Sequence, residues 1–89
     1  MALVLVKYGI NHPIEKLKIE TSKPDDSIVL IQDGIYWNLE NLSDLTKAKI
    51  YILKEDFLAR GYKEEDANYD LIDYEKFVEI IEKEEKFIG

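Results

Sequence analysis

The sequence contains no cysteine among its 89 residues. Disulfides, thiolate zinc sites, iron–sulfur clusters and cysteine nucleophiles are therefore excluded for this chain. It also has a single histidine, too few for the usual zinc-binding sets. We therefore expect neither a bound metal nor a cofactor.

Long apolar runs are missing as well. None approaches the roughly 20 residues needed to cross a bilayer. The first residues carry no basic segment before their apolar run, so a signal peptide is not predicted and a cytoplasmic protein is expected. The net charge of −7 disfavours direct binding to nucleic acid and to anionic membranes, but it permits a basic protein partner.

The residues that are present suffice for one small globular domain over residues 1–89. Apolar residues make up 46% of the chain, which is typical of a folded core. A domain this short buries only about 60–65% of its unfolded surface, so its own core is marginal.

Apolar runs alternate with helical patterns along the chain. Unbroken aliphatic runs predict strands buried on both faces at 2–7, 28–31 and 49–53, and a short fourth strand follows at 69–72. Helices are predicted at 13–20, from about 35, at 55–60 and after Asp73. This alternation predicts an α/β fold with three layers, α/β/α, around a mostly parallel four-stranded sheet.

Local signals refine these elements. Ile10, Ile14 and Leu17 fall on one face of the first helix, and Ile35, Leu39 and Leu42 form the apolar stripe of the second. Gly61 is placed to end the third helix in a left-handed conformation, and Asp73 to cap the last helix. The segment Phe87-Ile88-Gly89 is predicted to be a short apolar tail.

The candidate functional residues follow the ends of the predicted strands. In parallel α/β sheets, ligands bind beyond the carboxyl ends of the strands. We therefore expect a ligand or partner surface on that edge, formed by Asn11, His12, Gln32, Asp33, Gly34, Tyr36, Trp37, Glu55, Asp56 and Arg60.

These residues also have structural interpretations. Asp33 is either a general base or ligand acceptor, or the N-cap of the following helix. His12 is either an acid–base group or a helix-start residue, and acidic residues suit the first turn of a helix whatever its function. Tyr36 and Trp37 point about 100° apart on a helix, so one is expected to pack inward and the other to be exposed. No phosphate-binding glycine motif and no convincing nucleophile is present, which argues against an enzyme.

Three ordered segments resemble the DsrH/TusB family. Residues 30–36 (LIQDGIY) are similar to its LLQDGVY segment, residues 51–61 (YILKEDFLARG) to YALxEDLxARG, and residues 71–78 (LIDYEKFV) to xIDYxxFV. Residues 3–7 are a weaker counterpart of the LHTLxKSP start.

The resemblance implies a DsrE/DsrF/DsrH-like fold and a role in sulfur relay, in 2-thiolation of the tRNA wobble uridine or in dissimilatory sulfur metabolism. It also implies partners of the DsrE/TusD and DsrF/TusC types, the former carrying the sulfur on a cysteine. Since this chain has no cysteine, the resemblance implies a non-catalytic subunit that completes an oligomer and docks a partner.

The alternative is a stand-alone homo-oligomer that binds a small ligand at the strand ends, through His12, Asp33, Tyr36 and Asp56. Self-association, as a homodimer or in a hetero-oligomer, is expected under both hypotheses because a small core does not easily hide many aromatic rings. The rings concerned are Tyr36, Trp37, Phe57, Tyr62 and Phe87.

Overall fold

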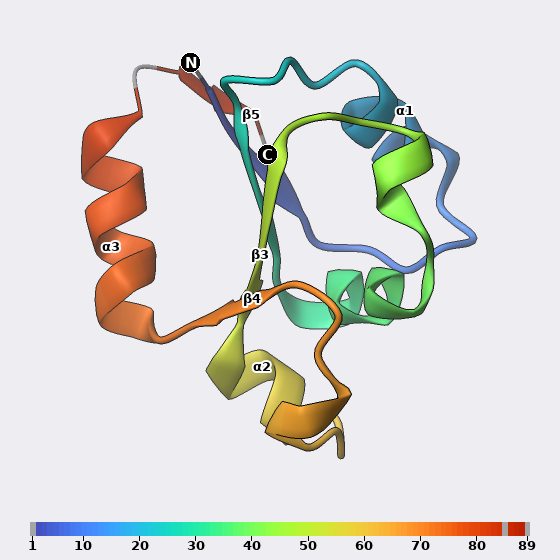
Figure 1. Ribbon diagram of the computed structural model, residues 1–89, viewed down its shortest axis with the longest axis vertical. Helices are drawn as coiled ribbons and strands as arrows, with labels where there is room; N and C mark the ends of the chain where they lie inside the picture. The colour runs from blue at the N-terminus through green and yellow to red at the C-terminus, as the bar shows by residue number, and fades with distance from the viewer. Residues whose placement is uncertain (1, 85, 89) are drawn as a thin grey trace.

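Five parallel strands form a single sheet in the computed structural model, which describes residues 2–84 and 86–88 (Figure 1). The strands are β1 (Ala2–Val6), β2 (Ser27–Leu30), β3 (Lys49–Leu53), β4 (Asp70–Ile72) and β5 (Lys86–Ile88). They lie in the order β4-β3-β2-β1-β5. The parallel sheet of the sequence prediction is therefore confirmed.

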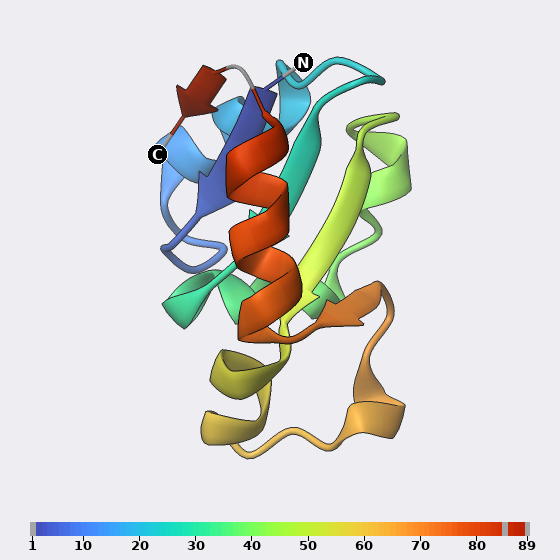
Figure 2. The ribbon, with the colours of Figure 1, turned by 90° about the vertical axis from the view of Figure 1, so that its left-hand side faces the viewer.

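Helices lie on both faces of the sheet. They are α1 (Pro13–Glu20), α2 (Lys54–Ala59) and α3 (Tyr74–Lys83), with 3₁₀ helices η1 (Gln32–Leu39), η2 (Leu42–Asp44) and η3 (Glu64–Asp66). Figures 1 and 2 show α3 packed across one face, with α1, η1 and η2 on the other. The connection from β4 to β5 runs across the sheet against the direction of the earlier ones, so a right-handed crossover places α3 on the opposite face. The three-layer prediction is confirmed.

The strands supply two cores from alternating side chains. Val4 and Val6 point to the α1 and η1 face, whereas Leu3 and Leu5 point to α3. All side chains of β1 are buried, as predicted for a strand covered on both faces. Among the described residues, no helix is long and apolar enough to cross a membrane.

The prediction of four strands is wrong, because the apolar tail forms a fifth. Phe87 pairs with Leu3 and Ile88 with Val4. These two side chains are exposed, so backbone pairing with β1, rather than side-chain burial, makes this segment a strand. Pairing on both sides keeps β1 in the interior of the sheet. The last residue of the predicted tail, Gly89, lies outside the described residues.

The predicted inner face of the first helix is also wrong. Ile14 and Leu17 are each 57% exposed, and Ile10 lies in the loop before α1 and is 47% exposed. Glu15 and Ile19, one turn apart, face the sheet instead. The sequence pattern failed here because the buried position is occupied by a carboxylate with four polar partners.

The second predicted helix is formed by η1 and η2 rather than by one α-helix. Residues three apart share a face in a 3₁₀ helix, so Asn38 joins Ile35 on the buried side while Leu39 is 66% exposed. The Asn38 side chain donates to the Asp66 carbonyl and accepts from the Asn68 amide. The prediction that Leu39 lies on the inner stripe is therefore wrong.

The other local predictions hold. Gly61 follows α2 with φ +88°, and the Asp73 carboxylate accepts from the Lys76 amide at 2.8 Å. The charged segment before β4 forms the single turn η3.

Candidate functional site

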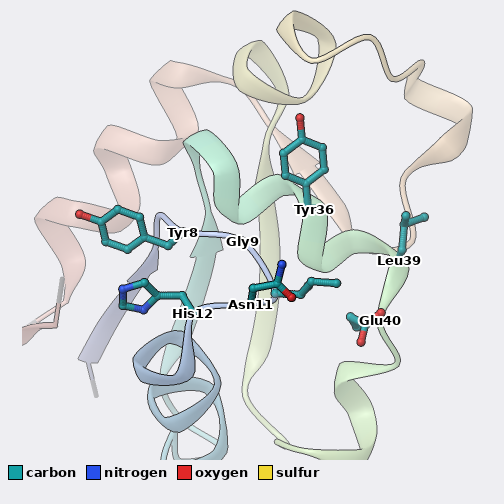
Figure 3. Close-up of a pocket in the computed structure, with 8 residues that line it drawn as sticks. Tyr8, Gly9, Asn11, His12, Tyr36, Leu39 and Glu40 are labelled. Atoms are coloured by element: carbon teal, nitrogen blue, oxygen red, sulfur yellow. The ribbon is translucent and has the colours of Figure 1, made fainter.

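A hollow of about 630 Å³ opens between the loop that follows β1 and the helix η1 that follows β2. It is lined by Tyr8, Gly9, Ile10, Asn11, His12, Tyr36, Leu39 and Glu40. In Figure 3, Tyr36 and Leu39 stand on the η1 side and Asn11 on the side of the loop. The hollow thus lies at the edge of the sheet where ligands of parallel α/β folds bind.

Glu15 holds the loop that forms one wall of the hollow. Its carboxylate accepts from the Lys7 amide at 2.6 Å and from the Tyr8 amide at 2.9 Å. Lys18 pairs with the same carboxylate at 2.6 Å and donates to the Leu5 carbonyl at 2.8 Å. The end of β1 and the start of α1 are therefore joined through a single buried side chain.

The electrostatic environment of Glu15 is set by opposing effects. Burial raises the pKa of its carboxyl, but the hydrogen bonds from Lys18 and from the Tyr8 and Lys7 amides outweigh burial. The pKa therefore lies below its ordinary value of 4.5, and the group is ionised at neutral pH.

The adjacent aromatic residues Tyr36 and Trp37 have separate roles. Trp37 is 3% exposed, and its indole Nε1 donates to the Tyr8 carbonyl at 3.0 Å. Tyr36 is 40% exposed and faces the hollow. The prediction that one ring packs inward and the other is exposed is confirmed, and Trp37 fastens η1 to the loop.

Gly34 allows η1 to lie against the end of β1. A Cβ atom at this position would meet the Val6 carbonyl oxygen at 1.8 Å. The same carbonyl accepts from the Ile31 amide at 3.0 Å. Gly34 is thus required by close backbone approach rather than by ligand contact.

A polar cluster forms outside the hollow where β2 enters η1. Gln32 has a left-handed backbone, φ 50°, and its amide donates to Asp56 at 2.7 Å. Arg60 bridges Asp33 at 3.3 Å and also donates to the Asp56 carbonyl. The N-cap interpretation of Asp33 is wrong, since η1 has no side-chain cap and this carboxylate binds Arg60.

The remaining candidates take structural positions. Glu55 accepts from the Tyr74 amide at 3.4 Å, at the start of α3. His12 stacks on Tyr8 at 4.7 Å between ring centroids, and its Nδ1 atom is buried without a hydrogen-bond partner. His12 precedes α1 at the N-cap position but makes no side-chain cap hydrogen bond.

The structure therefore divides the predicted site residues into groups. Asn11, His12 and Tyr36 line the hollow, whereas Gly34 and Trp37 are buried. The other five lie outside the hollow: Gln32, Asp33, Glu55, Asp56 and Arg60.

Sequence reasoning missed Ile10, Leu39 and Glu40 in the hollow, and Glu15 behind it. The two aliphatic residues had been assigned to buried helix faces, so no signal marked them as a surface. Glu15 stands one turn before Ile19, and a carboxylate at such an inward position was the signal available.

The walls of the hollow are mostly apolar and suit binding. Three large side chains on it are 40–66% exposed: Ile10, Tyr36 and Leu39. Within residues 2–84 and 86–88, no group of three or more His, Asp or Glu side chains is placed to hold a metal ion. The arrangement can accept an apolar side chain or a small apolar molecule.

Comparison with known proteins identifies the class to which this fold and edge belong. A family model described as "DsrH like protein" matches residues 13–87. The chain belongs to the DsrH-like protein family.

The similar solved structures are two NMR structures of the protein Tm0979 from Thermotoga maritima. Each is 61% identical to this chain and is matched over 100% of both chains, with TM-scores of 0.82 and 0.74. The second is described as a "putative sulfur transferase". No curated protein matches. Family and structural neighbour together support a role in sulfur relay.

Proposed function

We propose that this chain is a non-catalytic subunit of a sulfur-relay assembly. The observation that carries the proposal is a DsrH-like chain without a single cysteine. Persulfide transfer needs a thiolate, so the sulfur must be carried by a partner. The work left to this chain is to complete the oligomer and dock the thiol-bearing subunit.

The outward side of α1 supports docking. Ile14 and Leu17 point away from the sheet and are each 57% exposed. The hollow begins just before this helix and adds Tyr8, Ile10, Tyr36 and Leu39, all at least 40% exposed. Exposed apolar side chains gathered in this way mark protein interfaces.

The aromatic rings contribute less to this surface than the sequence predicted. Trp37 and Phe57 are buried in the core, and Tyr62 is half-buried against Phe57 at 4.8 Å between ring centroids. Tyr36 and Phe87 remain exposed. Association is therefore proposed to rest mainly on aliphatic side chains of α1 and the hollow.

Native mass spectrometry tests the proposal. Mixed at micromolar concentration with the DsrE/TusD-like and DsrF/TusC-like chains of its own organism, this chain is expected to give one complex containing all three. Substituting serine for both Ile14 and Leu17 is expected to leave the fold intact and weaken the complex at least about tenfold, because two apolar contacts are lost.

The matched control is the double serine variant of Val78 and Ile81, which are 41% and 39% exposed on α3. This variant should assemble like the parent. Equal loss in both double variants would reject α1 as the docking helix, and persistent failure of the parent chain to co-assemble would reject the proposed function.

The proposed pathway is 2-thiolation of the tRNA wobble uridine. With a net charge of −7, this chain is not expected to contact the RNA, so the partners would do so. Deleting its gene should remove 2-thiouridine from total tRNA, measured by liquid chromatography and mass spectrometry. Unchanged 2-thiouridine would direct the proposal to another sulfur pathway.

A second candidate function is a homo-oligomer that binds a small apolar molecule. The hollow favours it, since about 630 Å³ is within the range of small-molecule sites. Two of the residues once grouped for this role, Asp33 and Asp56, lie outside the hollow. A metabolite that raises the melting temperature of the parent but not of a Tyr36→Ala variant would favour this candidate.

A further inference from the structure

The hollow continues past Glu40 into a second depression. This depression, of about 400 Å³, shares Ile10, Asn11 and Glu40 with the hollow. Its other lining residues are Lys16, Trp37, Asn41, Asp44 and Leu45. Together the two form a groove between the segment 8–16 on one side and η1 with η2 on the other, here named the α1–η1 groove.

The two ends of the groove differ in chemistry. The hollow presents Tyr36 and Leu39, whereas the second depression presents the carboxylates of Glu40 and Asp44 opposite the single cation Lys16. None of these three charged side chains takes part in the ion pairs found among the described residues. Glu40 and Asp44 are exposed, so their charges are available to a partner.

We propose that the α1–η1 groove binds an extended segment of a partner protein that carries a large apolar side chain next to a Lys or Arg. The apolar side chain enters the hollow beside Tyr36 and Leu39, and the cation lies between Glu40 and Asp44. This proposal rests on the proposed function, because it names the surface on which the sulfur-carrying partner docks.

Charge favours a foreign basic segment over a second copy of this chain. Each copy carries −7, so two copies bring like charges together. A free small molecule would use the hollow alone and leave the neighbouring carboxylates without a role. An apolar pocket beside two carboxylates fits a short peptide in which both features are adjacent.

The probe is a synthetic hexapeptide, acetyl-Ser-Leu-Phe-Arg-Lys-Ser-amide, titrated into the ¹⁵N-labelled protein. Its twin has Glu-Glu in place of Arg-Lys. At low salt, the basic peptide is expected to shift the amide resonances of residues 8–16 and 36–45 in a saturable way. The acidic twin should bind at least about tenfold more weakly, because it places like charges together.

Two double variants separate the charges of the groove from net charge. Changing Glu40→Gln with Asp44→Asn should weaken the basic peptide about 3- to 10-fold. The control, Glu65→Gln with Glu75→Gln, removes the same charge from exposed positions outside the groove and should bind like the parent. Both variants must keep the parent's urea midpoint.

The proposal is overturned if the two peptides bind equally, if the shifted resonances lie outside the groove, or if only an uncharged apolar molecule binds. A dimer of the parent alone, detected by sedimentation equilibrium and abolished by Tyr36→Asp, would assign the groove to a second copy. If the Glu40 and Asp44 variant co-assembles like the parent, the groove proposal fails and the proposed function stands. If the parent never co-assembles, the proposed function fails whatever the peptide result.

Discussion

Replacing Gly34 with alanine is expected to prevent this chain from folding. The added Cβ would lie 1.8 Å from the Val6 carbonyl oxygen and 2.6 Å from its carbon, both backbone atoms that cannot move aside alone. Relief requires η1 to separate from β1. We expect a loss of at least about 4 kcal/mol, against a total stability of about 5–15 kcal/mol for a small domain.

Urea denaturation followed by circular dichroism measures this effect, and Gly9→Ala is the matched control. A Cβ at Gly9 would meet nothing closer than the Asp33 carbonyl oxygen at 3.9 Å, an ordinary contact. The Gly9 variant should unfold within about 1 kcal/mol of the parent. A Gly34→Ala protein with the parent's urea midpoint would show that η1 does not lie against β1 as described.

Glu15→Gln is expected to give the second largest effect. The substitution removes the counter-ion of a half-buried Lys18 and weakens the hydrogen bonds to the Lys7 and Tyr8 amides. Breaking such a pair inside a protein costs roughly 3 kcal/mol. Because this carboxylate holds the loop beside the hollow, partner binding should weaken along with stability.

The pH dependence of stability distinguishes this role from simple packing. The folded pKa of Glu15 lies below its ordinary value of 4.5, so its ionisation stabilises the folded state fully above that pH. The contribution is lost as the pH falls through the folded pKa. The Glu15→Gln variant should lack this acid loss, whereas Glu20→Gln, an exposed change on the same helix, should keep it. Identical acid profiles for the parent and the Glu15 variant would contradict the role of the carboxylate.

The sheet could be predicted because its strands announce themselves locally. Runs of aliphatic residues at 2–6, 28–30 and 49–53 have no polar side to expose, so burial on both faces is their stable arrangement. The fifth strand could not be predicted in this way. Its two apolar side chains are exposed, and its strand character depends on backbone pairing with β1, some 80 residues earlier in the chain.

The helices show where periodicity misleads. Ile14 and Leu17 were expected inside because apolar residues usually are, yet the inner face of α1 is filled by Ile19 and an ion-paired Glu15. Leu39 left the inner stripe because η1 turns every three residues, which brings Asn38 inward. Tertiary polar contacts, which single-residue hydrophobicity does not encode, decided both cases.

The candidate site could be placed at the carboxyl ends of the strands from topology alone. What topology could not give was its division into the hollow and the cluster formed by Gln32, Asp33, Asp56 and Arg60. The hollow is lined by apolar side chains that the sequence pattern had assigned to the core. The errors and the docking surface therefore coincide, since Leu39 and the α1 residues are apolar where no core covers them.

Sulfur transfer measured with and without this chain tests its proposed role most directly. A DsrE/TusD-like partner is loaded with ³⁵S persulfide, and the label reaching the next thiol-bearing protein is followed over time. Since this chain has no thiol, it should accelerate the transfer as part of the complex while never becoming labelled. Transfer at the same rate in its absence would contradict a role as a working subunit of the relay.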